Sequence, residues 1–297
     1  MLRTYKKKNK VLVIGGSGFL GSNLAQMLNS KGFNVTIYDI KQNVKNSKIR
    51  FLRGNIFNIK KLSKAIKGQN YVYFFAGMGD IAECMKNPIQ SIKQNILSVM
   101  RVLNLCKKYN ILRFIFASTI YVHSSQGSFY RVSKKSAELY IEEFSKKNNL
   151  KYNILRYGSV YGPNSDKRNN LFNIIYTALK NKKVIYRGTK NSVRKFIHVK
   201  DASLASIDIL KKKYANQKIV ITGKNEVKLS SFCKKLKKEM GLNSPIIYLN
   251  NAPGHYDKTP YFFKPEKEIV FKHKRVVNFN KGINELKKHV IENYFNK

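Results

Sequence analysis

A tyrosine and a lysine four residues apart could together move a proton. Tyr130 and Lys134 begin the segment 130–148, whose apolar spacing predicts a helix, so the two side chains share one helical face. Tyrosine has an ordinary pKa of about 10, but a neighbouring ammonium favours its phenolate, which is a usable base. Ser118 and Thr119 add two hydroxyls, one of which could hold a substrate oxygen during proton transfer.

A glycine-rich turn follows the first apolar segment. Residues 11–14 predict a strand and residues 19–30 a helix, with glycines at the junction. The first glycine permits a tight turn, the second lets a pyrophosphate approach the backbone, and the third lets the helix pack on the strand. The helix N-terminus adds N–H groups and the positive end of its dipole. We therefore expect a dinucleotide phosphate to lie against Gly15, Gly18, Phe19, Leu20 and Gly21.

A carboxylate ends the next strand-like segment, 34–38. Asp39 stands where it can accept hydrogen bonds from an adenosine ribose. Its charge would repel a 2′-phosphate, so the sequence favours NAD over NADP, although Lys41 nearby keeps NADP open.

Short apolar strands alternate with helical stretches through the first half of the chain. Strands are expected at 11–14, 34–38, 71–75, 113–117 and 152–156, and helices at 19–30, 59–66, 88–110 and 130–148. Nearly all-apolar strands in this order predict an α/β fold: a doubly wound parallel sheet of the Rossmann type, covered by helices on both faces.

The second half is less regular. We expect a helix near 171–180 and a return to the sheet over 197–211. The predicted division is a NAD-binding domain over 1–157, with a return segment near 195–222, and a smaller C-terminal substrate-binding domain formed by 158–194 and 223–297.

The chain is strongly basic, with 58 Lys and Arg against 16 Asp and Glu and a net charge of +42. Most of these cations are lysines, which occur along the whole chain singly or in pairs. This distribution indicates that the charge reflects coding bias on a solvated surface rather than a segment that binds nucleic acid. No apolar run is long enough for a membrane span, and the start does not resemble a secretory segment, so we expect a cytoplasmic protein. The three cysteines lack metal-ligand spacing, and no metal is expected.

Taken together, the motifs resemble the extended short-chain dehydrogenase/reductase family, in the NAD-dependent nucleotide-sugar epimerase/dehydratase branch related to UDP-galactose 4-epimerase. The resemblance runs nearly from end to end. It rests on Gly15, Gly18 and Gly21, Tyr130 with Lys134, Phe75–Gly77, Asn95, Leu155–Pro163 and Arg194–Asp201.

The resemblance implies a role for each matching residue. Thr119 would be the catalytic hydroxyl with Ser118 beside it, Tyr130 the acid and base, and Lys134 the group that binds the nicotinamide ribose. Arg194 would face a diphosphate, for which its planar fork is suited. The remaining implied contacts are Asn55, Ile56, Phe75, Ala76, Gly77, Asn95 and Tyr157 for the cofactor, and Thr119, Ser159, Asn170 and Arg194 for the substrate.

The family's reaction would be a hydride cycle on a nucleotide-diphosphate sugar: NAD oxidises a sugar hydroxyl to a keto group, and the hydride returns to the other face of that carbon. The resemblance also implies a homodimer through helices near 91–109 and 135–147, and a place in surface polysaccharide synthesis.

Three departures shape the expected function. Ala252–His255 replaces the family's Arg-Pro-Gly-Asp, which argues against UDP-galactose itself. Ile120 and Tyr121 stand where 4,6-dehydratases carry an Asp-Glu pair, which disfavours dehydration, and the short loop 119–130 predicts a differently shaped substrate mouth. We therefore expect a nucleotide-sugar epimerase; the alternatives are an NAD(P)-dependent nucleotide-sugar reductase or dehydratase, and a non-catalytic NAD- or RNA-binding member of the family.

Overall fold

The computed structural model describes residues 9–44, 46–249, 255, 268–274 and 276–295. Eight strands form one parallel sheet in the order β14-β11-β6-β5-β4-β1-β2-β3. The strands are β1 (Lys10–Ile14), β2 (Asn34–Asp39), β3 (Arg50–Arg53), β4 (Tyr71–Phe74), β5 (Arg113–Thr119), β6 (Tyr152–Tyr157), β11 (Gln217–Ile221) and β14 (Ile269–Val270). The predicted fold class, an α/β doubly wound parallel sheet, is confirmed.

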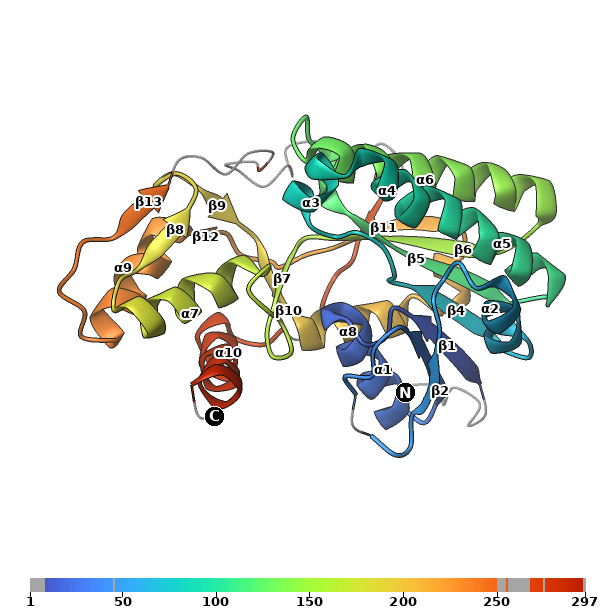
Figure 1. The fold of residues 1–297 in the computed structure, drawn as a ribbon, viewed down its shortest axis with the longest axis horizontal. Helices are drawn as coiled ribbons and strands as arrows, with labels where there is room; N and C mark the ends of the chain where they lie inside the picture. Colours follow the sequence, from blue (N-terminus) through green and yellow to red (C-terminus); the bar gives the residue numbers. More distant parts are fainter. Residues whose placement is uncertain (1–8, 45, 250–254, 256–267, 275, 296–297) are drawn as a thin grey trace.

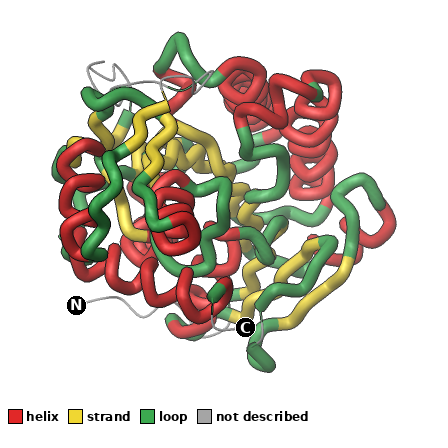
Figure 2. Tube along the Cα trace, turned by 60° about the vertical axis from the view of Figure 1, so that its left-hand side comes forward, coloured by secondary structure: helices red, strands yellow, loops and turns green. Residues whose placement is uncertain are grey.

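Helices cover both faces of this sheet (Figures 1 and 2). Side chains of β1 alternate between two apolar cores: Val11 and Val13 pack on one face and Leu12 and Ile14 on the other. Because both faces are buried, the strand is apolar throughout. The first face carries α1 (Phe19–Ser30) and α8 (Val199–Asp208), and the second carries α2 (Ile59–Ile66), α5 (Ser98–Lys108) and α6 (Ser128–Asn148). The short α4 (Pro88–Ile92) packs against α6.

A smaller lobe stands beside the sheet, on the left in Figure 1. Its helices are α7 (Asn170–Asn181), α9 (Leu229–Glu239) and α10 (Phe279–Tyr294), which share a third apolar core. Three two-stranded sheets complete it: β7 (Ser159–Tyr161) with β10 (Phe196–His198), β9 (Val193–Arg194) with β12 (Val227–Lys228), and β8 (Ile185–Arg187) with β13 (Ile247–Leu249).

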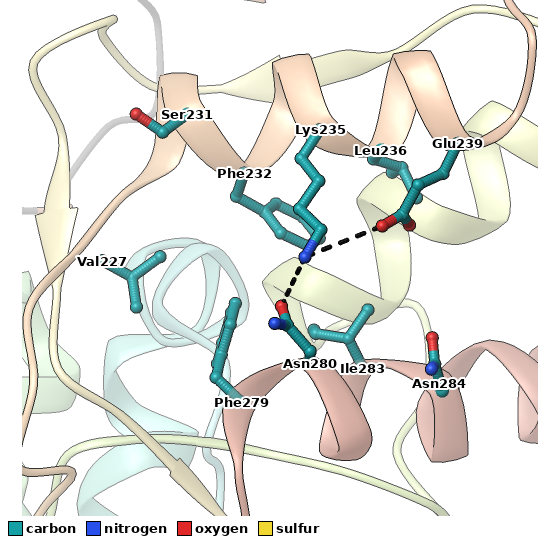
Figure 3. Close-up of a pocket in the computed structure, with 10 residues that line it drawn as sticks. All are labelled: Val227, Ser231, Phe232, Lys235, Leu236, Glu239, Phe279, Asn280, Ile283 and Asn284. Atoms are coloured by element: carbon teal, nitrogen blue, oxygen red, sulfur yellow. Dashed lines mark hydrogen bonds and ion pairs between the residues drawn. The ribbon is translucent and has the colours of Figure 1, made fainter.

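A groove of about 230 Å³ lies between α9 and α10 (Figure 3). Lys235 reaches across it from α9 and donates to Asn280 Oδ1 at 2.7 Å, while its Nζ lies 3.7 Å from Glu239. The hydrogen bond to Asn280 joins the two helices above their shared apolar core, whereas the contact with Glu239 lies within α9.

The long helix expected over 88–110 is interrupted. Between α4 and α5 the backbone forms a π-helical turn, Lys93–Leu97, in the middle of which lies the buried Asn95. Such a turn changes the direction of the side chains that it carries, and hydrophobic spacing does not reveal it.

The prediction that the chain returns to the sheet over 197–211 is wrong. Residues 197–211 form most of β10, which pairs with β7 outside the central sheet, and then α8. Val199, Ala202 and Ala205 are buried at helical spacing, and the strand that rejoins the sheet is β11. The domain boundaries stay a prediction, but Ile269–Val270, assigned to the substrate-binding domain, pair with β11.

Other elements were not predicted, among them β3 at the edge of the sheet, the short α3 (Ile81–Lys86) and the short strands β7, β8 and β9. Within the described ranges, no helix combines the length and apolar character needed to cross a bilayer.

Candidate active site

One cavity of about 890 Å³ lies between the carboxyl ends of the central strands and the smaller lobe. The sheet side contributes the segments that follow β1 and β4 and the ends of β5 and β6, and the lobe contributes α7, β8 and β9. Ligands of open parallel sheets bind at this edge. Predicted site residues that line it are Gly15, Gly18, Phe19, Leu20, Gly21, Phe75, Gly77, Ser118, Thr119, Tyr130, Lys134, Tyr157, Asn170 and Arg194.

The glycine turn is packed tightly on every side except the one that faces the cavity. Gly15 has φ +80°, and a Cβ there would lie 2.5 Å from the Ala76 nitrogen. A Cβ on Gly21 would lie 2.3 Å from the Gly15 oxygen. Gly18, the N-cap of α1, would meet only that oxygen at an ordinary 3.5 Å. The turn thus leaves room for a ligand at the N-terminus of α1, where amide groups can bind phosphate.

Asp39 braces this turn from the end of β2. Its carboxylate accepts hydrogen bonds from the Ser17 N–H at 2.9 Å and the Ile40 N–H at 2.7 Å. Asp39 is not among the residues that line the cavity, so its contact with a ribose stays a prediction.

Lys134 is buried between α6 and β5, with 6% of its surface exposed. Its Nζ donates to the Ala117 carbonyl at 3.0 Å and lies 4.7 Å from the centre of the Phe116 ring. Burial lowers its pKa to about 8, while the neighbouring Cys84 and Glu138 act in the opposite direction. An ammonium in this position can stabilise a nearby anion more strongly than one in water.

Tyr130 lies one helical turn before Lys134 and is half-buried at the cavity. Its ring makes an edge-on contact with Tyr121, with the ring centres 6.1 Å apart. Tyr121 also lines the cavity, and its hydroxyl lies 2.8 Å from His255 Nδ1. In the sequence, Tyr121 was noted only because it differs from the dehydratase pattern. The structure shows that it lies beside Tyr130, the candidate acid and base.

The two hydroxyls at the end of β5 make different contacts. Thr119 Oγ1 accepts the Tyr121 N–H at 3.2 Å, which caps the short helix η2 (Ile120–His123) and leaves the Thr119 O–H to donate into the cavity. Ser118 instead donates its hydroxyl to the buried Glu138. Thr119 is therefore the better placed of the two to hold a substrate oxygen.

Asn95 supports the cavity wall from behind. It is fully buried, accepts the Met78 N–H at 2.8 Å, and donates to the Met78 carbonyl at 3.0 Å and to Ser133 Oγ at 2.9 Å. Gly77 has φ +136°, and a Cβ there would lie 2.4 Å from Asn95 Oδ1. Met78, not Asn95, lines the cavity, so the contact of Asn95 with the cofactor stays a prediction.

Four other predicted residues lie away from the lining. Asn55 accepts the Phe57 N–H at 2.9 Å, and Ile56 packs against the core below β4. Ala76 donates its N–H to the Ile14 carbonyl at 3.1 Å, and Ser159 opposes Phe196 in the small sheet of β7. Their predicted contacts with cofactor or substrate stay predictions.

The lobe side of the cavity is rich in cations. Arg194, 6% exposed on β9, and Arg187, at the end of β8, both line it. Arg168 lines it too and holds Asp166 through Nη2 at 2.6 Å. Arg187 and Arg168 were missed because Arg187 lies on a three-residue strand and Arg168 in the turn before α7, and no periodicity reveals the direction of either side chain.

The Ala252–Gly254 part of the predicted departure lies outside the described residues, whereas His255 lines the cavity. In the described part of the chain, no cluster of three or more His, Cys, Asp or Glu residues could hold a metal ion.

The residues present fit NAD. A single cavity connects the open glycine turn at the N-terminus of α1 with Tyr130 and Lys134, and Phe75 and Tyr157 form apolar walls between them. The phosphates would lie at the turn and the nicotinamide ribose near Lys134.

Comparison with known proteins agrees with this geometry. A sequence model of the NAD dependent epimerase/dehydratase family matches residues 11–222. A putative UDP-glucose 4-epimerase from Methanocaldococcus jannaschii is 28% identical over 92% of this chain and 99% of its own length. A dTDP-D-glucose 4,6-dehydratase from Dictyostelium discoideum is 27% identical over 69% of this chain and 56% of its own.

The fold also matches solved structures. The UDP-glucuronic acid 4-epimerase from Bacillus cereus, crystallised with UDP-glucuronic acid and NAD, superimposes with a TM-score of 0.85 at 23% identity, covering 96% of this chain and 100% of its own. The chain belongs to the NAD dependent epimerase/dehydratase family and is an NAD-dependent enzyme.

Proposed function

We propose that this enzyme is a nucleotide-sugar 4-epimerase that acts on a UDP-sugar. One observation carries the proposal: Thr119, Tyr130 and Lys134 line the same cavity as Arg187 and Arg194. Groups for acid–base catalysis at a sugar hydroxyl and cations suited to a diphosphate therefore face one space.

The chain's own residues would handle the proton and the oxygen. NAD held at the glycine turn and near Lys134 would supply a hydride acceptor, and later a hydride donor, for one sugar carbon. Thr119 donates a hydrogen bond to the reacting sugar oxygen, and Tyr130 takes the proton from it and gives it back after the sugar has turned. The Lys134 ammonium stabilises the Tyr130 phenolate, which makes the tyrosine a base at neutral pH.

The diphosphate would bind on the lobe side. Arg194 is nearly buried on β9, so its guanidinium is held in a fixed orientation suited to bidentate contact with phosphate oxygens. The net charge of +42 adds an attractive field for an anionic substrate. The UDP-sugar epimerases among the relatives support UDP as the nucleotide.

Epimerisation is favoured over dehydration. Ile120, which follows Thr119, is buried, and Tyr121 occupies the next position at the cavity. Asp80 and Asp166 are the carboxylates among the described lining residues; Asp80 caps α3 and Asp166 is held by Arg168. Neither follows Thr119, where an acid for water elimination is expected.

The same proposal includes a homodimer, a cytoplasmic location and a role in surface polysaccharide synthesis. Large apolar side chains are exposed on the segments expected to pair, among them Ile92 (49% exposed) on α4 and Leu139 (52%) on α6. The free, buried state of Cys84, Cys106 and Cys233 fits a reducing compartment.

The test is turnover of a panel of UDP-sugars by the purified protein, by Tyr130→Phe and by Tyr140→Phe. Tyr140 lies on the same helix but is 52% exposed, so it is a matched control. We expect a 4-epimer from the protein and the control, and kcat lowered by about 10²–10⁴-fold in Tyr130→Phe. Full turnover by Tyr130→Phe would refute the assignment, and net consumption of added reduced cofactor would favour a reductase.

A further inference from the structure

A buried carboxylate ties α6 and β5, the two elements that carry the catalytic candidates, to the neighbouring strand β6. Glu138 on α6 is 1% exposed. Its Oε1 accepts the Ser118 hydroxyl from the end of β5 and Arg156 Nε from β6 at 3.0 Å, and its Oε2 accepts Arg156 Nη2. Glu138 stands one turn after Lys134 on the same helical face, so a single side chain spans α6, β5 and β6 directly behind the cavity.

Arg156 extends this cluster to the C-terminal part of the chain. Its Nη1 pairs with Glu268, which directly precedes β14, and lies 3.1 Å from His123 Nε2 on η2. The same His123 nitrogen lies 2.9 Å from Glu268 Oε2. Burial and the Arg156 charge lower the pKa of His123 to about 4, so this imidazole is neutral at pH 7.

The charges behind the site are balanced in number. With His123 neutral, the cations Lys134 and Arg156 face the carboxylates Glu138 and Glu268. Arg156 is engaged by both carboxylates, and Glu138 is the carboxylate on the same helix as Lys134. Buried charges are stable only when they are paired in this way.

We propose that Glu138 is a positioning residue for the reaction: it fixes Ser118, and with it the strand end that carries Thr119, and its charge keeps Lys134 in the ammonium form. Ser118 thus acts through its bond to Glu138, and Glu268 completes the cluster by holding the far side of Arg156.

The charged and titratable groups around Lys134 set the direction of the effect. Cys84 on α3 and Glu138 on its own helix raise the pKa of Lys134 against the larger effect of burial. Around Glu138 lie Arg156 on β6 and, beyond it, His123 and Glu268. Removing the Glu138 charge leaves the cluster one positive charge in excess, which disfavours the Lys134 ammonium.

The test compares Glu138→Gln, which keeps the shape and loses the charge, with Ser118→Ala, which keeps the charge and loses the hydroxyl. Glu143→Gln is the control, because Glu143 lies on the same helix with 72% of its side chain exposed and pairs with Lys146. Lysine ionisation is followed through pH by carbon-13 NMR of labelled lysine side chains, with Lys134 assigned by its absence in Lys134→Met.

We expect Glu138→Gln to move the Lys134 midpoint from about 8 to lower pH, by about one pH unit, the effect of one nearby opposite charge. Ser118→Ala and Glu143→Gln should leave the midpoint in place, and Ser118→Ala should lower kcat several-fold with KM unchanged. If Glu138→Gln does not fold, Glu268→Gln should give a smaller shift in the same direction, because Glu268 acts from the far side of Arg156.

The inference would be overturned if the titration midpoint of Lys134 were unchanged in Glu138→Gln, or in Glu268→Gln if Glu138→Gln does not fold. It would also be overturned if Ser118→Ala kept the full kcat. The turnover arm rests on the proposed function, but the NMR midpoint does not. A shifted midpoint in a protein that converts no UDP-sugar would therefore refute the proposed function alone, whereas turnover with an unshifted midpoint would refute this inference alone.

Discussion

Replacing the buried Lys134 by methionine should make the protein more stable while it removes activity. The folded chain holds the Lys134 ammonium between α6 and β5 with 6% of its surface exposed. Methionine has a similar length and no charge, so it fills the same space without the cost of burying an ion.

The size of the effect follows from the pKa of Lys134. Burial lowers it from 10.5 to about 8. Since one pH unit corresponds to about 1.4 kcal/mol, the ammonium costs the folded state about 3 kcal/mol. The variant loses the hydrogen bond to the Ala117 carbonyl, worth about 1 kcal/mol. The net expectation at pH 7 is a gain of about 2 kcal/mol in the free energy of unfolding.

The gain should depend on pH in one direction. Below pH 8 Lys134 is charged in both the folded and the unfolded chain, so the full cost is present. Between pH 8 and 10.5 the folded chain loses this proton first, the unfolded chain binds more protons, and the parent protein gains stability as pH rises. The advantage of Lys134→Met should therefore shrink over this window, and above it the variant should be the less stable protein, by the hydrogen bond of about 1 kcal/mol that it has lost.

Urea unfolding of both proteins at pH 7 and at pH 10 measures this difference. A Lys134→Met protein that is less stable than the parent at pH 7, or whose advantage is the same at both pH values, would refute the reasoning about the buried ammonium. Loss of epimerase activity in a more stable variant would show that Lys134 is retained for function.

Two other predictions concern the cavity walls. Gly21→Ala should unfold at a lower temperature and lose NAD, because its Cβ would lie 2.3 Å from the Gly15 oxygen. Gly18→Ala, whose Cβ would lie at an ordinary 3.5 Å from that oxygen, should fold normally and bind NAD more weakly. Thermal unfolding and mass spectrometry of the released cofactor check both variants, and equal unfolding temperatures for the two would contradict this packing. Asn95→Ala should lose about 2–4 kcal/mol in urea unfolding, because the buried Met78 N–H and carbonyl lose their partner; a loss below about 0.5 kcal/mol would mean that another group satisfies them.

The parts of the site that depend on local spacing could be predicted from the sequence. The glycine turn needs only a strand, three glycines and a helix in order, and Tyr130 with Lys134 needs only one helical turn. These residues line one cavity because parallel strands bring their carboxyl ends to the same edge. The fold class followed from the same alternation of apolar strands and helices.

Other parts depend on contacts between distant segments, which spacing does not contain. The π-helical turn places Asn95 against Met78, and no periodicity distinguishes it from a regular helix. Glu138 lies on a helical face with the buried Ala137 and Ile141, and only the meeting of β5, β6 and α6 shows that its carboxylate has partners there. Arg187 reaches the cavity from a three-residue strand, too short to be predicted.

The most direct measurement of the proposed reaction is epimerisation of a UDP-sugar in D₂O by the purified enzyme with its own NAD. Because the hydride removed from the sugar carbon returns to that carbon, we predict a 4-epimer that carries no deuterium at the inverted position. Deuterium at that carbon would show that the proton comes from solvent, which would contradict a hydride cycle at the Tyr130 site.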